Sequence, residues 1–204
     1  MDDESLIRGF QAGDESCFGE LVRRHRERVY RVARTVLRDH AQADEASQEA
    51  WVKAYHGLAA FQGESRFTTW MHRIAVNAAL DLREREARLR RTAEAAHRDA
   101  APPRDPEPPG QGALGRLIRR EEIERVRAAV ARLPERQRLT LVLKVHEGLK
   151  YTEIAEILEC PVGTAKANVH HAVANLRRLL AQGADAVAGA TAGRRLAAGE
   201  GSPP

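Results

Sequence analysis

Residues 151–170 read YTEIAEILECPVGTAKANVH, and this stretch is the strongest indicator of the fold. Apolar residues recur at helical spacing before Cys160, Pro161 and Gly163 then break the chain, and a second helix-forming stretch follows. Two short helices joined by such a turn are typical of a helix-turn-helix, whose second helix enters the major groove of DNA. The stretch contains no arginine, although the chain uses arginine heavily elsewhere.

The composition favours a small all-α protein. The chain has 204 residues, of which 43% are apolar and 30% charged, and this balance suits one or two small folded domains. Aromatic residues make up only 4%, so the core has to be built mainly from Leu, Val, Ile and Ala. Helix formers dominate, and β-branched runs are short. The net charge of +4 is compatible with nucleic-acid binding but does not by itself indicate it.

Two changes in composition divide the chain. Residues 92–113 contain five prolines and almost no large apolar side chains, which predicts a flexible Pro-rich linker. Residues 182–204 are rich in Ala and Gly without an apolar pattern, which predicts a disordered tail. Two folded blocks remain, at 1–91 and 114–181.

Apolar periodicity predicts the helices of both blocks. In the first block, helices are expected over 18–39, over 43–59 and from 68 to beyond 82. In the second block they are expected over 115–132, from 134 to the residue before Gly148, around 154–158, and from 161–164 onward. Pro134 fits the first turn of a helix, where its missing N–H does no harm.

Several functional classes are excluded by what the sequence lacks. Its N-terminus is acidic where a signal peptide would be basic, and no apolar run reaches the ~18 residues of a membrane span, so we expect a cytoplasmic protein without membrane insertion. Cys17 and Cys160 suggest no disulfide framework. Cys160 with His170 and His171 lacks a fourth ligand, so no metal site is expected. No phosphate loop or nucleophile–base set is recognisable, and we therefore expect no enzymatic activity, cofactor or small-molecule substrate.

Four segments resemble consecutive signatures of bacterial sigma factors: GDESCFGELVRRHRERVYRVA, DEASQEAWVKAYHGL, FQGESRFTTWMHRIAVNAALD and YTEIAEILECPVGTAKANVH. The type that they resemble is the extracytoplasmic-function (ECF) group of the sigma-70 family. Members of this group keep only sigma region 2, expected here over 1–91, and sigma region 4 with its helix-turn-helix, expected over 114–181. The order of the motifs and the position of the linker make the resemblance specific.

The resemblance implies a polymerase-binding surface on the second helix. In the family this helix binds the coiled-coil clamp of the β′ subunit of core RNA polymerase, and region 4 binds the β flap. The positions in this sequence that match the polymerase-binding face are Asp44, Gln48, Glu49 and Lys53. Without the resemblance, the same polar residues would be read as an ordinary solvated helix face.

The third helix and the loop before it meet the −10 promoter element in the family. The matching residues are Arg66, Thr69, Trp70, His72, Arg73 and Asn77. Basic side chains can bind phosphates, and aromatic faces can stack on bases that leave the duplex. The helical spacing of Trp70 with Ile74 equally predicts a core residue, or one that both packs and shapes a base pocket. Asn77 lies among apolar neighbours and is a candidate for either a DNA contact or a structural role.

The last helix resembles the one that reads the −35 element. Its predicted DNA-binding residues are Thr164, Lys166, Asn168, His170 and His171. Where family members commonly read PVGTVKSRLHRAR, this chain has lost basic residues, Asn168 and His171 both standing in place of arginine. Each lost phosphate contact weakens binding and flattens its dependence on salt. Four basic residues on neighbouring helices are candidates for part of the backbone contacts: Arg136, Arg138, Lys144 and Lys150.

The resemblance implies an ECF sigma factor that binds core RNA polymerase and promoter DNA, directs transcription initiation and is held inactive by an anti-sigma factor. A second hypothesis is a sigma-like decoy that binds an anti-sigma factor without directing transcription, which the arginine-poor reading helix favours. A third is an ordinary helix-turn-helix repressor, which explains the second block but not the first. Co-purification with polymerase and run-off transcription distinguish the three.

Overall fold

The computed structural model of the protein describes residues 1–94 and 114–197, and these residues form eight α-helices without a strand. The prediction of an all-α fold is confirmed. The helices are α1 (Asp3–Gln11), α2 (Ser16–Leu37), α3 (His40–Leu58), α4 (Phe67–Glu94), α5 (Leu114–Ala131), α6 (Glu135–Val145), α7 (Tyr151–Ile157) and α8 (Val162–Ala197).

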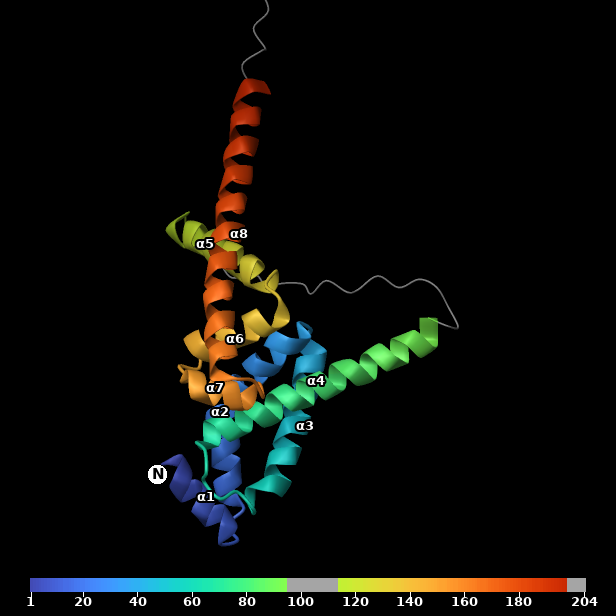
Figure 1. Ribbon diagram of the computed structural model, residues 1–204, viewed down its shortest axis with the longest axis vertical. Coiled ribbons are helices and arrows are strands. Elements are labelled where there is room, and N and C mark those ends of the chain that lie inside the picture. Colours follow the sequence, from blue (N-terminus) through green and yellow to red (C-terminus); the bar gives the residue numbers. More distant parts are fainter. Residues whose placement is uncertain (95–113, 198–204) are drawn as a thin grey trace, which may run out of the picture.

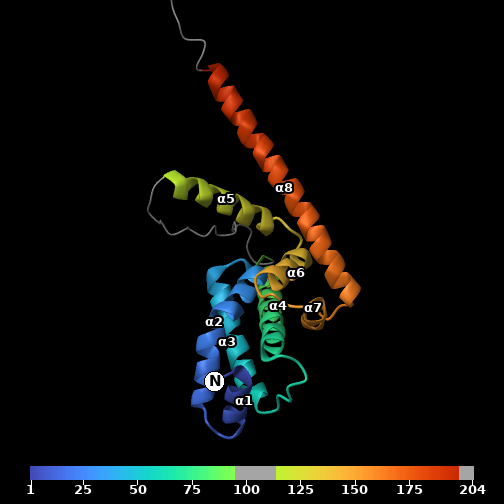
Figure 2. The same cartoon turned by 90° about the vertical axis from the view of Figure 1, so that its left-hand side faces the viewer.

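The first domain is the bundle of α1 to α4 (Figures 1 and 2). The apolar stripe of α2 that the sequence predicted lies in its core, where Val29 and Ala33 are fully buried. The first helix, α1, was not among the helices predicted from the sequence, although its Leu6 and Ile7 are buried. Asp2 caps it by accepting a hydrogen bond from the backbone N–H of Ser5 at 2.8 Å, and α1 then packs against α2 through Leu6.

Small side chains let α3 and α4 pack closely. Alanines of both helices are fully buried: Ala43, Ala46, Ala50 and Ala54 on α3, and Ala75, Ala78 and Ala79 on α4. Helices with alanine at their contacts can approach nearer than helices separated by large side chains. This packing explains how a chain with few aromatic residues still buries a continuous core.

The second domain contains α5 to α8 and includes the predicted helix-turn-helix, formed by α7 and α8. The chain reverses between these helices at Glu159, whose φ of 48° lies in the left-handed region. Pro134 stands at the N-cap of α6, one residue before the predicted first turn. Leu133 and Leu141 pack with Ala172 of α8 in a small core of this domain.

The ends of two segments differ from the sequence predictions. The helix α4 continues to Glu94, three residues past the predicted domain boundary, and the rest of the predicted linker lies outside the described residues. The predicted disordered tail began at residue 182, whereas α8 continues to Ala197. Alanine is the strongest helix former, so an Ala-rich segment can extend an existing helix without burying an apolar face. Residues 198–204 lie outside the described part of the chain.

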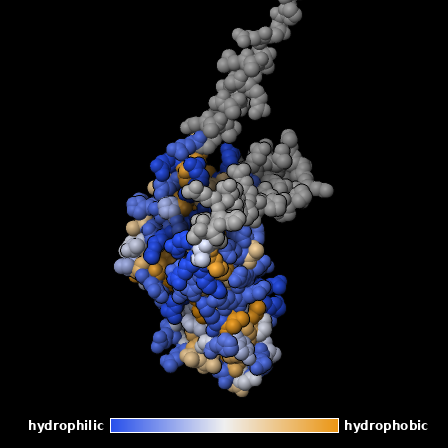
Figure 3. Space-filling model, turned by 90° about the vertical axis from the view of Figure 1, so that its right-hand side faces the viewer, coloured by the Kyte–Doolittle hydropathy of each residue, from blue (hydrophilic) through white to orange (hydrophobic). Residues whose placement is uncertain are grey.

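The two domains pack against each other, with α7 on α4 and α6 on α2. Figures 1 and 2 both place these helices side by side, while the C-terminal half of α8 projects away from the bundle. One hydrophobic core runs through both domains, since Leu143 and Ile154 of the second domain join the core residues of α2 and α4. The face shown in Figure 3 is mostly hydrophilic, with separate small hydrophobic patches.

Candidate nucleic-acid and polymerase interfaces

A groove between α2 and α3 holds two of the four predicted polymerase-binding residues. Asp44 and Gln48 are exposed on α3 and line a cavity of about 650 Å³. The aromatic side chains of Tyr30 and Trp51 line the same cavity. The lining also includes the basic residues Arg26, Arg31 and Arg34, so the groove offers both charges beside aromatic surface to a protein partner.

Glu49 and Lys53, the other two predicted residues, face α4. Nζ of Lys53 lies 3.0 Å from Oε1 of Glu49 and 3.0 Å from Oδ2 of Asp81, and Nη2 of Arg85 lies 2.5 Å from Oε2 of Glu49. Partial burial opposes ionisation of Glu49, but hydrogen bonds and charge from Lys53 and Arg85 outweigh it and lower the pKa of the carboxyl. These residues tie α3 to α4, on a different side of α3 from Asp44.

A second cavity lies where the loop between α3 and α4 meets α1. Its volume is about 760 Å³, and its lining includes three groups of side chains: the aromatic Phe61 and Phe67, the basic Arg8, Arg24 and Arg66, and the acidic Asp2, Asp3 and Glu4. Phe67 is buried, whereas the ring of Phe61 is half-buried. An aromatic face beside guanidinium groups is the kind of surface on which an unstacked base binds, with its phosphate held by the charge.

Trp70 packs behind the wall of this cavity. Its ring centroid lies 5.0 Å from that of Phe61 and 5.9 Å from that of Phe67. The ring also covers Gly57, where an added Cβ would stand 3.1 Å from Cζ2 of Trp70. The side chain therefore combines packing with shaping of the wall, and Gly57 leaves the space that it needs.

The other predicted −10 residues on α4 and the loop before it differ in accessibility. Asn77 is exposed, and the side chains of Arg66 and Arg73 are 75% and 39% exposed. Thr69 and His72 are only 1% and 2% exposed. Both were predicted to contact DNA, and the structure instead places Thr69 against Glu153 of α7 and His72 beside Glu147 in the turn between α6 and α7.

His72 is uncharged at neutral pH in this arrangement. Burial disfavours the imidazolium and lowers the pKa of His72 to about 4, although the nearby charge of Glu147 acts in the opposite direction. Nε2 of His72 lies 3.7 Å from Oε2 of Glu147. The cationic phosphate contact predicted for His72 is therefore not available while the domains are packed together.

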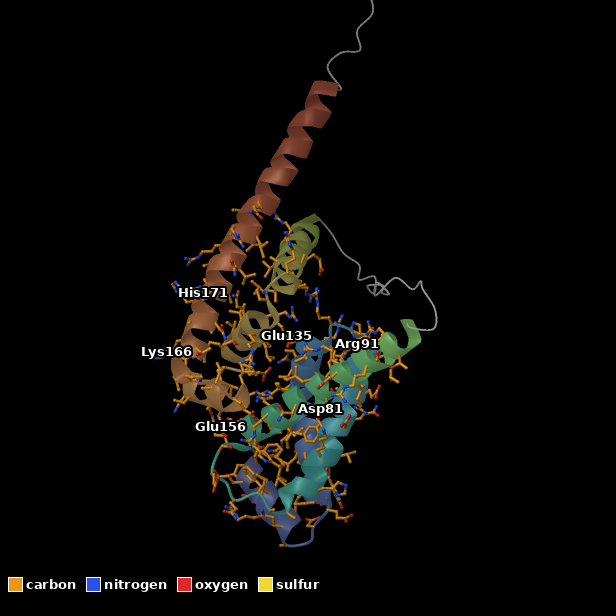
Figure 4. The ribbon with its side chains drawn as sticks, turned by 45° about the vertical axis from the view of Figure 1, so that its right-hand side comes forward. Asp81, Arg91, Glu135, Glu156, Lys166 and His171 are labelled. Atoms are coloured by element: carbon orange, nitrogen blue, oxygen red, sulfur yellow. The ribbon has the colours of Figure 1, made fainter. Side chains whose placement is uncertain are left out.

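The reading helix α8 presents its predicted face to solvent. Among the five predicted residues, Asn168 is half-buried. The other four are exposed: Thr164, Lys166, His170 and His171. Ala165 and Ala172 are fully buried on the opposite face. Figure 4 shows Lys166 and His171 on the outer side of α8, away from α4. Lys166 is the one side chain of the predicted set with a permanent charge.

Arg138, a candidate for phosphate contacts, has a structural role instead. It is 6% exposed, and burial lowers the pKa of its guanidinium. Nε donates to the carbonyl oxygen of Thr35 in α2 at 3.0 Å, and Nη1 donates to that of Leu133 at 3.1 Å. The neighbouring Arg136 remains exposed.

Lys144 also serves the second domain itself. Nζ donates to the carbonyl oxygen of Leu149 at 3.0 Å and lies 4.8 Å from the centroid of the Tyr151 ring. Lys150 remains exposed at the N-cap of α7. An ammonium group cannot accept a capping hydrogen bond, and the cap is instead formed by Glu153, whose Oε2 accepts from the backbone N–H of Lys150 at 2.6 Å.

The interface between the domains holds polar residues that the sequence analysis missed. Oε1 of Glu147 accepts a hydrogen bond from Nη1 of Arg31 at 2.6 Å, and the Glu147 side chain is 1% exposed. No sequence motif indicates this pairing, since the two residues lie in different domains. Within the described residues, no group of three His, Cys, Asp or Glu side chains could hold a metal ion, and no helix is both long and apolar enough to cross a membrane.

Comparisons with known proteins identify both domains. Residues 21–89 match the family model for Sigma-70 region 2, and residues 123–176 match that for Sigma-70, region 4. The RNA polymerase sigma-H factor of Pseudomonas aeruginosa is 33% identical over 177 residues, covering 83% of this chain and 89% of that protein. The ECF RNA polymerase sigma factor SigM of Mycobacterium tuberculosis is 35% identical over 178 residues, with 87% and 84% covered. The ECF RNA polymerase sigma-E factor of Escherichia coli is 35% identical over 181 residues, with 84% and 91% covered.

Solved structures share the fold. CnrH in complex with the cytosolic domain of CnrY superposes with a TM-score of 0.62 at 24% identity, over 88% of this chain and 97% of that chain. The sigma factor RpoE from Bartonella quintana, in complex with the anti-sigma factor NepR, has a TM-score of 0.64 at 21% identity, over 80% and 96%. Together, the two matched regions and the identity to curated relatives show that the chain belongs to the ECF sigma factors of the sigma-70 family, which bind core RNA polymerase and promoter DNA to start transcription.

Proposed function

We propose that this sigma factor binds core RNA polymerase through the groove between α2 and α3. The observation that carries the proposal is the placement of Asp44 and Gln48, both exposed, in a groove that Tyr30 and Trp51 also line. A basic helix of the β′ clamp can pair with the carboxylate and the amide while its apolar side chains cover the rings. Glu49 and Lys53 act at the border of this surface by holding α4 against α3.

The −10 element binds at the loop cavity and along α4. A base that leaves the duplex stacks on Phe61, and Arg66 and Arg73 hold the phosphates of its strand. Asn77 supplies a hydrogen bond to the exposed strand farther along α4. Thr69 and His72 join this surface once the second domain moves away.

The −35 element binds the outer face of α8. Its N-terminal residues enter the major groove, where Lys166 meets a phosphate and Thr164 and His170 form polar contacts. Asn168 and His171 complete this face. Because Lys166 is the only one of the five predicted residues with a permanent charge, this contact is weaker and less dependent on salt than one made by an arginine-rich helix.

The protein acts in the cytoplasm, where its polymerase partner works, and catalyses no reaction of its own. It needs no cofactor and no small-molecule substrate. RpoE from Bartonella quintana was solved with an anti-sigma factor, and an anti-sigma factor is also the proposed regulator of this chain.

A decoy function remains the competing proposal, because the reading helix carries little charge. A decoy binds an anti-sigma factor but needs no groove for core polymerase. The experiment is therefore a pull-down with core enzyme followed by run-off transcription, comparing the wild type with the double variant Asp44→Ala/Gln48→Ala. The control is Glu45→Ala, which removes an exposed carboxylate of the same helix that does not line the groove.

The sigma-factor proposal expects wild type and control to retain polymerase and to direct transcription, and the double variant to lose both with an unchanged circular dichroism spectrum. Retention of polymerase by the double variant would reject the assignment of the groove. A wild type that binds an anti-sigma factor but neither polymerase nor promoter would establish the decoy.

A further inference from the structure

The helix α1 forms one side of the cavity at the loop between α3 and α4. Its exposed residues Glu4, Arg8 and Gln11 line the cavity together with the loop residue Phe61. Figures 1 and 2 both place α1 at the lower end of the first domain, beside this loop. The segment that matches Sigma-70 region 2 begins at residue 21, beyond the end of α1, so the match assigns no role to these side chains.

Gln11, the last residue of α1, connects this helix to the loop. Its Nε2 donates to the carbonyl oxygen of Leu58 at the end of α3, at 3.1 Å, and to that of Phe61 at 2.9 Å. A primary amide carries two N–H donors, one for each carbonyl. The carbonyl oxygen of Leu58 also accepts from the backbone N–H of Phe61 at 3.2 Å. One side chain of α1 therefore closes the turn that carries the Phe61 ring.

The other end of α1 is fixed to α2. Oδ2 of Asp3 lies 2.8 Å from Nε2 of His25, and Oδ1 lies 3.6 Å from Nη1 of Arg24. Nη1 of Arg24 also donates to the carbonyl oxygen of Met1 at 2.8 Å. Because its first turn is held by α2 and its last residue is bonded to the loop, α1 supports the loop from a fixed position.

Phe61 is held from two sides. Its carbonyl oxygen is bonded to Gln11, while its ring packs on Trp70 with 5.0 Å between the centroids. Phe61 is half-buried and lines the cavity, so a base can reach its ring. Stacking depends on the relative orientation of the two rings. A side chain that fixes the turn at Phe61 therefore also fixes the surface on which the base stacks.

Arg8 is the arginine of this cavity that the protein itself uses least. Its Nη2 donates to Oγ of Ser5 at 3.3 Å, and it forms no ion pair within 4 Å among the described residues. Arg24, by contrast, is paired with carboxylates of α1 and α2, and Arg66 lies 3.8 Å from Glu153. A guanidinium with unused N–H groups beside an aromatic ring can bind a phosphate of the strand whose base stacks there.

Two of the three acidic residues of the cavity act within the first domain itself. Asp2 accepts from the backbone N–H of Ser5 as the N-cap of α1, and Asp3 is paired with α2. Glu4, one turn before Arg8, has no hydrogen bond of its side chain and no ion pair in the described part of the chain. A phosphate that enters the cavity is therefore attracted by Arg8 and repelled by Glu4.

We propose that α1 is part of the −10 DNA site, with Gln11 as the positioning residue that holds Phe61 in place for an unstacked base and Arg8 as a residue that binds a phosphate of the same strand. This inference rests on the proposed stacking of a base on Phe61. It extends that function to a helix that lies outside the matched sigma regions.

The test uses holoenzyme reconstituted from core polymerase and the full-length chain. The probe is a labelled DNA single strand selected with the wild-type holoenzyme from random sequences, and fluorescence anisotropy measures its affinity at several salt concentrations. Gln11→Ala and Phe61→Ala are made singly and together. Gln11→Met keeps the length of the side chain without its donors, and Gln42→Ala is the matched control outside the cavity.

Phe61→Ala should weaken binding about fivefold or more, as expected when an aromatic stacking surface is lost. Gln11→Ala and Gln11→Met should each weaken it about threefold or more, whereas Gln42→Ala should not. In the Phe61→Ala background, Gln11→Ala should add less than about twofold, because Gln11 acts through that ring. Full additivity, or unchanged affinity in both Gln11 variants, would overturn the role of Gln11.

Arg8→Ala should weaken binding and flatten the slope of log affinity against log salt by about 0.7, the value for one phosphate of a single strand. Glu4→Gln should raise the affinity. The charge-matched controls are Arg132→Ala and Glu45→Gln, which change exposed residues outside the cavity and should alter neither quantity. A wild-type slope in Arg8→Ala, or an equal effect of Arg132→Ala, would overturn the role of Arg8.

The same measurements separate this inference from the proposed function. Wild-type affinity in Phe61→Ala would reject the stacking of a base on this ring, and the role of Gln11 with it. A loss of affinity in Phe61→Ala that is absent from Gln11→Ala and Arg8→Ala would reject the assignment of α1 alone. Thermal denaturation and core binding, recorded for every variant, distinguish a loss of the fold from a loss of DNA binding.

Discussion

His72 and Glu147 face each other across the domain interface, with Nε2 of the ring 3.7 Å from Oε2 of the carboxylate. Both side chains are almost completely buried, and each has one polar atom without a hydrogen-bond partner among the described residues. An unsatisfied buried polar group destabilises a structure by about 1–3 kcal/mol. The contact between the domains is therefore held by neighbouring ion pairs and apolar packing despite this pair.

Acid is expected to separate the domains through His72. In the closed state, with the two domains packed together, its pKa is about 4 because burial disfavours the imidazolium. The charge of Glu147 opposes this shift, whereas the charges of Arg28, His25 and Arg31 add to it. Separation of the domains, which gives the open state, exposes the ring and returns its pKa to ~6.5. The open state then binds more protons, so the closed state has its full stability above about pH 6.5 and loses it as the pH falls toward 4.

Lowering the pH from 7.5 to 5.5 should shift the equilibrium about tenfold toward the open state, which corresponds to about 1.4 kcal/mol. Small-angle X-ray scattering across this range measures the change. His72→Gln keeps a polar side chain of similar size but cannot titrate, so this variant should lose the dependence. A dependence that persists in His72→Gln would show that His72 is not its cause.

Removal of the Arg138 side chain should destabilise the whole molecule. Arg138→Ala leaves the carbonyl oxygens of Thr35 and Leu133 without their donor, and hydrogen bonds from a charged group contribute about 1.5–3 kcal/mol. We expect a loss of at least about 2 kcal/mol in the free energy of unfolding, measured by urea denaturation. Arg136→Ala, at an exposed position of the same helix, should change it by less than about 0.5 kcal/mol.

Asn77→Ala should impair promoter melting more than initial promoter binding. The side chain is exposed on α4, and its proposed partner exists only in the separated strand. Permanganate footprinting measures opening on a duplex promoter, and a template that is already unpaired at the −10 element should restore much of the activity. An effect of equal size on both templates would show that Asn77 does not act in melting.

Added arginine on α8 should strengthen −35 binding. Asn168→Arg and His171→Arg each place a cation on the predicted face, so affinity should rise and the salt dependence steepen by about one unit per phosphate gained. Lys166→Ala should weaken binding across all sequences. The measurement is fluorescence anisotropy of full-length protein on a duplex selected with that protein from random sequences.

The matched control for these variants is Ala59→Arg, which adds the same charge at an exposed position after the end of α3. If this control raises the affinity as much as His171→Arg, the gain reflects net charge alone. If neither the arginine gains nor Lys166→Ala change the affinity, α8 does not lie in the groove, and the decoy function becomes the better proposal.

The sequence by itself determined most of the helices of both domains and the exposed face of α8. The 3.6-residue periodicity of apolar side chains is a local property, so it predicted the buried stripe of α2 and the inner face of α8 around Ala165 and Ala172. Pro134, Pro161 and Gly148 marked the breaks between helices for equally local reasons. The family resemblance rested on these same segments, and the matched sigma regions confirmed it.

Only the tertiary structure decided how the two domains meet. Arg31 and Glu147 are 116 positions apart, and Arg138 reaches the carbonyl of Thr35 across 103 positions. Charged residues such as these are usually solvated, and no local pattern distinguishes one that is buried by a distant partner. His72 shows the consequence. The family resemblance predicts a DNA contact for it, whereas the structure buries its ring beside Glu147 of the second domain, and burial removes its charge.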